Sequence, residues 1–247
     1  SICWCGVIFL GVTGSLILWQ GLLLNSVLAS TFYMPLHEAA HKNIWGKRTT
    51  SRWAEDAIGK ACSIPTGINF SSHRAGHMRH HAFTNDPARD PDHFTDGRLS
   101  ELPVKFYGMT MVYSFLPFFA LIKAQIRFWL FSTIFLVVCF ATGHGVEALM
   151  LWWLPARIQL CWLMFILAWY PHHPANETSR YRHTRVAVFR GSGMLIRGHD
   201  HHAMHHLFPR VPHYRLKALW KELAPELVQR GVRAEGRAVG ATSPVVW

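Results

Sequence analysis

The stretch Gly198-His199-Asp200-His201-His202-Ala203-Met204-His205-His206-Leu207-Phe208-Pro209 decides how the rest of the chain is interpreted. It places five histidines within eight residues. His202, His205 and His206 stand at positions i, i+3 and i+4, so on a helix they share one face. Because neutral imidazole is a common metal ligand, this spacing predicts one wall of a metal site.

The same H-x-x-H-H spacing is found much earlier in the chain, at His77, His80 and His81. A shorter pair, His37 and His41, comes first and stands at i and i+4. Together the three motifs offer eight imidazoles, whereas one zinc ion is usually satisfied by about three or four protein ligands. The spacing therefore predicts a site for two metal ions, assembled in space from distant parts of the chain.

The composition indicates a membrane protein with a sizeable water-facing part. Half of the 247 residues are hydrophobic. Only 16% are charged, compared with about 25% in soluble domains. The five cysteines form no C-x-x-C pair, which argues against a disulfide framework or a zinc ribbon. The chain begins Ser1-Ile2-Cys3, so we expect no signal peptide and a natural N-terminal segment that is missing.

The net charge of +11 is segregated along the chain. Nine Lys and Arg residues lie from Lys42 to Arg98, and twelve lie from Arg180 to Arg237. Apolar blocks flank both regions, as the positive-inside rule predicts for cytoplasmic loops. A nucleic-acid-binding protein would be basic too, but it would not need the apolar blocks. We therefore expect no nucleic-acid partner.

The apolar blocks predict an all-α integral membrane protein with about four transmembrane helices and a cytoplasmic, histidine-rich helical cap that holds two metals. One long helix in place of the first two is the alternative. We expect one domain over 1–247, with residues 144–154 on the far side of the membrane. The expected segments are spans at about 2–17, 20–41, 126–143 and 155–170, a cap of 42–101 and 171–226, and a weakly structured tail of 227–247.

Two other classes of protein compete with a membrane oxidoreductase. The stretch His37-Glu38-Ala39-Ala40-His41 spells H-E-x-x-H, the zinc-protease motif in which the glutamate is the general base. That interpretation leaves both H-x-x-H-H clusters without a role, and the one Asp-Gly step, Asp96-Gly97, lies in a polar loop. A metal transporter would need ligands along a spanning path, whereas these histidines lie almost entirely outside the expected spans.

The series H-x3-H, H-x2-H-H, H-x2-H-H between hydrophobic spans resembles the membrane fatty acid desaturase superfamily. That group includes acyl desaturases, alkane and sterol oxygenases, and carotenoid hydroxylases and ketolases. The phrases at 77–87, 169–172 and 202–212 are similar to a bacterial branch described as fatty acid desaturases or carotene-hydroxylase-like proteins. The resemblance extends from about Leu36 to Leu219.

The resemblance implies a centre of two Fe²⁺ ions, which zinc could replace in a preparation. A further histidine commonly follows the last span, and His172 best fits that place, with His173 as the alternative. The implied reaction is O2-dependent oxidation of an unactivated C–H bond, with fatty acyl desaturation leading and hydroxylation or ketolation of a lipid, alkane or carotenoid as the alternative. The implied ligands are His37, His41, His77, His80, His81, His172, His202, His205 and His206.

Nearby polar groups are candidates to orient these imidazoles by hydrogen bonds. Glu38 lies between the two histidines of its helix turn, and Asp200 sits inside the last cluster. The aspartates of the loop after His81, among them Asp86 and Asp90, are candidates as well, with loop stabilisation as the equal alternative. We expect ordinary polar roles for His93, His144, His183 and His213. For His73, His199 and His201 we expect either support of a ligand imidazole or a surface position.

The expected partners follow from the same reasoning. The substrate is lipid-soluble and enters from the bilayer, and O2 is the oxidant. The chain has no flavin or haem signature, so a separate electron donor is expected, such as a ferredoxin-type protein with its reductase. An acidic carrier of this kind would suit the basic face, although cytoplasmic topology alone also accounts for the positive charge.

Overall fold

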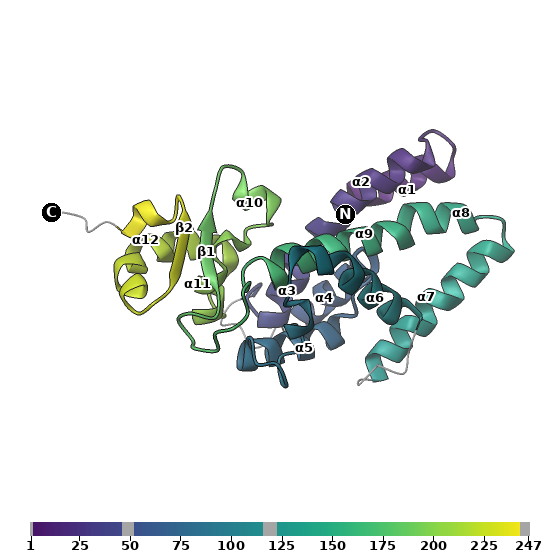
Figure 1. Cartoon of the computed structure of the whole chain (residues 1–247). Helices are drawn as coiled ribbons and strands as arrows, with labels where there is room; N and C mark the ends of the chain where they lie inside the picture. The colour runs from purple at the N-terminus through teal and green to yellow at the C-terminus, as the bar shows by residue number, and fades with distance from the viewer. Residues whose placement is uncertain (1, 46–51, 116–122, 243–247) are drawn as a thin grey trace. The chain divides into compact units, whose positions relative to one another are not determined.

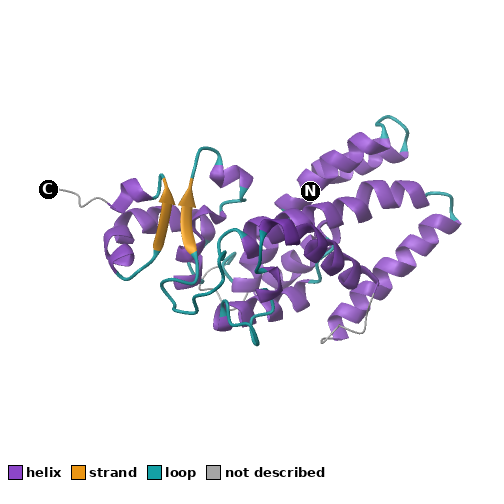
Figure 2. Cartoon of the chain, viewed as in Figure 1, coloured by secondary structure: helices purple, strands orange, loops and turns teal. Residues whose placement is uncertain are grey.

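The structure is a computed structural model that describes residues 2–45, 52–115 and 123–242 (Figure 1). Helices dominate the described residues (Figure 2). The chain divides into two compact units. The first contains 1–40, 53–74 and 106–162, and the second contains 41–52, 75–105 and 163–247.

The first unit is helical in its described part. Its last helix runs without a break from Gly145 to Trp169. The residues of this helix from Leu163 onward belong to the second unit. The elements in chain order are α1 (Ile2–Val12), α2 (Leu18–Thr31), α3 (Tyr33–His41), α4 (Arg52–Thr66), the start of α5 (Phe70–Phe83), α6 (Leu102–Phe115), α7 (Lys123–Ala141), α8 (Gly145–Ala148), the π-helix η5 (Leu149–Trp153) and α9 (Leu154–Leu163).

The helix Gly145–Trp169 has 25 residues and a mean hydropathy of 1.5. At about 1.5 Å per residue it is longer than the roughly 30 Å hydrocarbon core of a bilayer. Within the described residues no other helix is both long and apolar enough to cross a membrane. Ile2–Val12 and Ile126–Ala141 are shorter apolar helices.

The sequence predicts the start of this last helix near Pro155, and the structure places it at Gly145. A proline inside a helix cannot donate to the carbonyl four residues before it, which here belongs to Leu151. The side chain of Asn25 replaces the missing donor, because its Nδ2 lies 2.7 Å from that carbonyl oxygen. The helix can therefore continue through Pro155.

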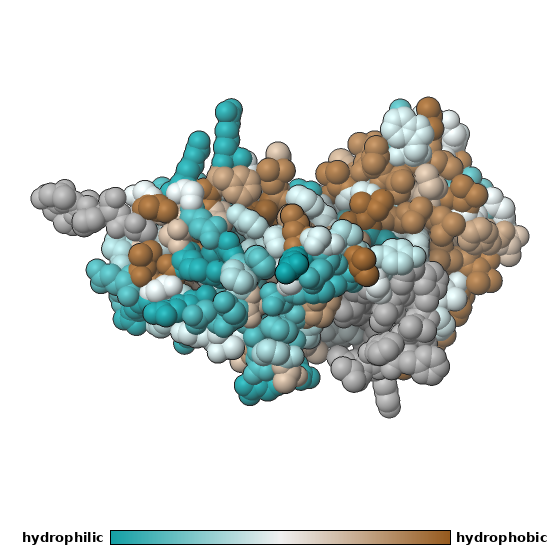
Figure 3. All heavy atoms as spheres, viewed as in Figure 1, coloured by the Kyte–Doolittle hydropathy of each residue, from teal (hydrophilic) through white to brown (hydrophobic). Residues whose placement is uncertain are grey.

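Two glycines allow α1 and α2 to approach the same point of the helix. A Cβ atom at Gly11 would lie 2.7 Å from the Leu151 side chain, and one at Gly21 would lie 2.4 Å from it. Small residues permit such close packing between membrane helices. The first unit also exposes large apolar side chains, including Phe9, Leu23 and Val27, and hydrophobic residues dominate the α1 and α2 surface in Figure 3.

We expect Asn25→Leu to lower the free energy of unfolding in detergent by about 1–2 kcal/mol, because it leaves the Leu151 carbonyl without a donor. Gln20→Leu is the matched control, since Gln20 is the other polar interruption of the first apolar stretch. It should change the stability by less than about 0.5 kcal/mol. Denaturant titration of both variants measures the difference, and equal losses would contradict the assigned role of Asn25.

The second unit holds the rest of α5 and a small α/β region. The all-α expectation missed two short parallel strands, which pair Arg185 with Arg233 and Val188 with Gly236. The remaining elements are η2 (His93–Thr95), η3 (Leu99–Glu101), the π-helix η6 (Met164–Trp169), β1 (Arg185–Val188), α10 (Ser192–Leu195), η7 (His199–His201), α11 (His202–Leu207), α12 (His213–Gln229), β2 (Arg233–Gly236) and η8 (Val239–Thr242).

Two other expectations about element boundaries were wrong. The helix expected over 20–41 breaks at Phe32, between α2 and α3. The tail expected to be weakly structured from 227 contains the end of α12, β2 and η8. The tail is ordered because Val232 and Ala238 join the apolar core around Trp220. Residues 243–247 of that tail lie outside the described part.

Candidate metal centre

Helix α5 presents the middle histidine motif. It begins after Asn69, whose Oδ1 accepts a hydrogen bond from the Ser72 backbone N–H at 2.9 Å, as an N-cap residue does. His77, His80 and His81 lie on its last turns, and the first two are buried. The predicted helical spacing is therefore confirmed for this motif.

Helix α11 presents the last motif and has two faces. Gly198 starts the approach to it with a positive φ of 81°, a conformation that favours glycine. Met204 and Leu207 pack into the apolar core of the second unit, together with Leu216 and Trp220. His202, His205 and His206 are buried as well and lie together with histidines from other segments.

The first histidine group consists of His41, His77, His81 and His205, four residues of the second unit that lie on α3, α5 and α11. Their Nε2 atoms converge in a chain of short separations. The distance is 2.8 Å from His41 to His77, 3.1 Å from His77 to His81, and 2.9 Å from His81 to His205. The rings of His41 and His205 also meet edge to face, with centroids 4.6 Å apart.

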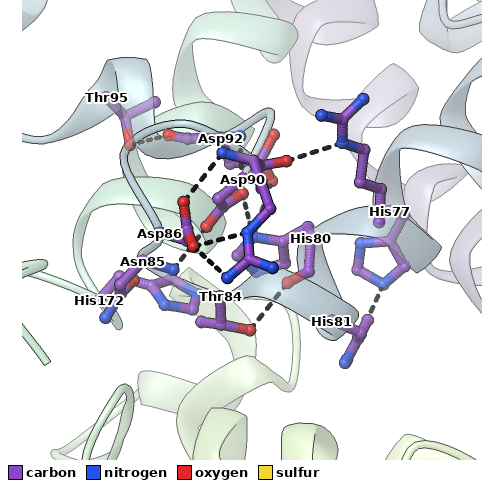
Figure 4. Close-up of polar contacts among 12 residues, drawn as sticks. His77, His80, His81, Thr84, Asn85, Asp86, Asp90, Asp92, Thr95 and His172 are labelled. Carbon is purple, nitrogen blue, oxygen red and sulfur yellow. Dashed lines mark hydrogen bonds and ion pairs between the residues drawn. The ribbon is translucent and has the colours of Figure 1, made fainter. Parts of the chain in front are cut away.

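The second histidine group consists of His80, His172, His202 and His206. One ring nitrogen from each lies within 4.8 Å of the others, and all four residues are buried. The Nε2 of His202 is 3.0 Å from that of His172 and 3.1 Å from that of His206. His172, which follows the last apolar helix, is thus part of a group whose other members come from α5 and α11. Figure 4 shows two members of this group, His80 and His172.

Hydrogen bonds hold the Nδ1 atoms of three members of the second group. His80 Nδ1 lies 2.9 Å from the Asp90 carboxylate, His206 Nδ1 lies 3.2 Å from the Thr84 hydroxyl, and His172 Nδ1 lies 3.3 Å from the His183 carbonyl. Each arrangement suits an Nδ1–H donor. The same tautomer leaves Nε2 with a free lone pair, which is the form that binds a metal.

Burial lowers the pKa well below the usual imidazole value in three members of the second group, His172, His202 and His206. Neighbouring imidazoles lower these pKa values further, because two positive charges in one buried site repel. For His80, burial also lowers the pKa, but the carboxylates of Asp92 and Asp90 outweigh it, so its pKa is raised. Three of the four rings are therefore neutral at physiological pH.

Asp90 is the centre of the network behind His80. Besides the imidazole, it accepts backbone N–H groups from Asn85 at 2.7 Å and from Asp92 at 2.8 Å. Asn85 has a positive φ of 63° and donates its side-chain amide to the carbonyls of Glu177 and His183. The loop after α5 is thereby tied to the segment that follows His172.

The first motif lies at the end of α3. His41 belongs to the second unit and joins the first histidine group, whereas His37, one turn earlier on the same helix, lies in the part of α3 that belongs to the first unit. His37 is fully buried, and its Nδ1 is 3.2 Å from the Glu38 carboxylate. Glu38 therefore contacts the imidazole that the sequence suggested it would orient.

The structure separates the remaining candidates. His173 stacks on Trp169 with a 37% exposed side chain, and no described contact joins it to either histidine group. Asp86 binds Arg89 and two backbone N–H groups of its own loop, so it is a loop-stabilising residue. Asp200 contacts His201 and Ser192 rather than a member of either group.

For His199 and His201 the sequence left two alternatives, support of a ligand imidazole or a surface position. The surface position is wrong, because both residues are buried. The Nδ1 of His199 lies 3.4 Å from that of His202. Thr84, Asn85 and His183 were not predicted to support the site. The ring of His183 lies 5.1 Å from that of His206, and burial lowers its pKa to about 4.

The histidine motifs that form this geometry lie within a region shared with a known family. The sequence matches the fatty acid desaturase family over residues 13–235. The chain belongs to this family. No curated protein sequence matches the chain. The match includes all three histidine motifs, so the zinc-protease interpretation of His37–His41 is set aside. Desaturase membership implies an oxidoreductase enzyme that is associated with a membrane.

The histidine groups suit the iron on which this family usually depends. Imidazole nitrogen is a good ligand for iron. Nitrogens bound at about 2.1 Å to one metal in tetrahedral or octahedral geometry lie roughly 3.0–3.4 Å apart. The short Nε2 separations in both groups, from 2.8 to 3.1 Å, come close to this spacing.

Proposed function

We propose that the chain is an O2-dependent di-iron membrane oxidoreductase that desaturates a fatty acyl lipid. The observation that carries the proposal is the convergence of imidazole Nε2 atoms in two groups. Each group offers enough donors for one metal. Two iron ions so held would supply the oxidising power, with O2, to break an unactivated C–H bond.

The residues around the irons would have distinct tasks. The proposed ligands are the histidines of the three motifs together with His172. Asp90, Thr84 and the His183 carbonyl would keep ligand rings in the tautomer that presents Nε2. Glu38 would do the same for His37. Because the rings are buried and mostly neutral, metal binding needs little proton release from them.

The proposal extends to four spans, with the metal centre and residues 42–101 and 171–226 on the cytoplasmic face of a bacterial inner membrane. Family membership and the apolar helix Gly145–Trp169 support a membrane location. The exposed apolar side chains of α1, α2 and α7 support further membrane-embedded helices. The twelve basic residues from Arg180 to Arg237 suit an acidic ferredoxin-type electron donor.

Hydroxylation or ketolation of a lipid, alkane or carotenoid is the second candidate. Both reactions begin by removing a hydrogen atom, and the placement of the substrate carbon decides whether a second hydrogen is lost or oxygen is added. The histidine geometry is compatible with either outcome. We favour desaturation over these reactions because the matched family is that of the fatty acid desaturases.

We expect the purified protein to hold about two iron ions per chain. Cells that express it should accumulate an oxidised lipid that is absent from cells expressing His205→Ala. His213→Ala, which changes a histidine on α12 outside both groups, is the matched control and should leave the product in place. Metal analysis of the purified protein and profiling of the lipids and pigments of expressing cells measure these outcomes. If no lipid or carotenoid product depends on His205, the proposed function fails.

A further inference from the structure

The first unit contains two hollows that share part of their walls. One has a volume of about 450 Å³ and is lined by Lys60, Ser63, Asn69 and Arg127 among other residues. The other has a volume of about 190 Å³ and an almost wholly apolar lining. Ile64 and Phe131 line both hollows, so the two are neighbours that share these wall residues. We call the larger one the basic hollow, after Lys60 and Arg127, and the smaller one the apolar hollow.

Residues of helix α7 line both hollows. Arg127, Phe131, Phe135 and Cys139 follow one another at intervals of four residues, so they form one stripe along the helix. Arg127 lines the basic hollow, Phe131 lines both, and Phe135 and Cys139 line the apolar one. Twelve residues of helix make this stripe about 18 Å long.

The charged groups of the basic hollow are all positive. Lys60 and Arg127 are exposed, neither forms an ion pair with an acidic group of the described chain, and no acidic residue lines the hollow. Ser63, Asn69 and Ser71 add hydroxyl and amide groups, and the rest of the lining is apolar, from Ile64, Phe70, Phe128 and Phe131. Two cations with neutral hydrogen-bonding groups suit a phosphate.

The apolar hollow suits a hydrocarbon chain. The rings of Phe135 and Trp152 meet edge to face at 5.0 Å on its wall, and Leu151 and Trp4 add aliphatic and aromatic surface. Its titratable lining residues besides Cys139 are His144 and Glu147, at the turn between α7 and α8. Phe131 and Phe135 are about half exposed, so the hollow opens at the apolar surface of the unit.

We propose that these hollows form a binding site for an anionic glycerophospholipid of the bilayer. Lys60 and Arg127 hold the phosphate headgroup, and one acyl chain lies along Phe131, Phe135 and Cys139. Together the volumes fall in the range of about 300–1,000 Å³ that is usual for small-molecule sites. The site is independent of the proposed oxidation, because none of its residues belongs to the histidine groups.

Lipid retention tests the proposal without turnover. Protein reconstituted with equal amounts of phosphatidylglycerol and phosphatidylcholine would be analysed by native mass spectrometry. We expect the natural sequence to retain more phosphatidylglycerol than phosphatidylcholine. Since each cation near a headgroup contributes about 1 kcal/mol, Lys60→Gln with Arg127→Gln should weaken this preference roughly thirty-fold.

Three further variants make the result specific. Lys217→Gln with Lys221→Gln removes the same charge from α12 and should leave the preference unchanged. Lys60→Arg with Arg127→Lys keeps both charges and should retain the preference for phosphatidylglycerol. Ala148→Phe fills the apolar hollow and should reduce retention of both lipids. Iron content of each sample shows that the protein is folded. Equal lipid retention by the natural sequence and the Lys60/Arg127 double variant would overturn the proposal.

Discussion

Replacing His172 with alanine is expected to halve the iron content, from about two ions per chain to about one, and to abolish the oxidised product. His172 belongs to the second histidine group alone, where its Nε2 lies 3.0 Å from that of His202. The first histidine group keeps all its members in this variant. Iron analysis of purified protein and lipid profiling of expressing cells measure the two effects.

His173→Ala is the matched control, since it removes the neighbouring imidazole. His173 is more than a third exposed and stacks on Trp169, so its loss should remove only a surface contact. We expect two irons and unchanged product. If His173→Ala loses iron and His172→Ala does not, the composition of the second histidine group is wrong.

The histidine motifs could be predicted because their spacing is a local property. Residues at i, i+3 and i+4 share a helix face wherever the helix goes, and a repeated imidazole spacing of this kind strongly favours a metal site. No such spacing distinguishes His172 from His173, and His172 was preferred only because the family resemblance implies a histidine directly after the last span. The structure distinguishes them, because one ring meets His202 and the other meets Trp169.

The supporting residues could not be predicted in the same way. Asn85 bonds the carbonyls of Glu177 and His183, which are more than ninety residues away. The Thr84 hydroxyl contacts His206, which is still farther away in the sequence. Threonine and asparagine are common in loops, so their identity alone does not reveal such contacts. His183 acts through its backbone carbonyl, which every residue possesses.

The boundaries of the last apolar helix illustrate a second limit. A proline within an apolar stretch ordinarily marks a helix start or a kink. At Pro155 the helix continues because Asn25, far away in the sequence, bonds the carbonyl that the proline leaves without a donor. Asn25 is visible in the sequence as an interruption of an apolar block, but its partner becomes known only from the fold.

Replacing Asp90 with asparagine is expected to weaken iron binding about 10- to 100-fold, the usual effect of removing a carboxylate that orients a ligand histidine. The carboxylate faces the His80 Nδ1 at 2.9 Å with one oxygen and the Asn85 backbone N–H at 2.7 Å with the other. An amide can accept only one of these two bonds, so either the ring or the loop loses its partner. Competition with a chelator measures the affinity.

Asp86→Asn is the control within the same loop, because it removes a carboxylate of equal size that binds Arg89 instead of a histidine. Exposed ion pairs contribute about 0–1 kcal/mol, so we expect a small change in stability and no change in iron affinity. Asp90 also accepts a hydrogen bond from the Asp92 backbone N–H, so any substitution at this position is expected to disturb the loop as well. Equal iron affinity in the two variants would therefore show that Asp90 supports the loop and does not orient His80.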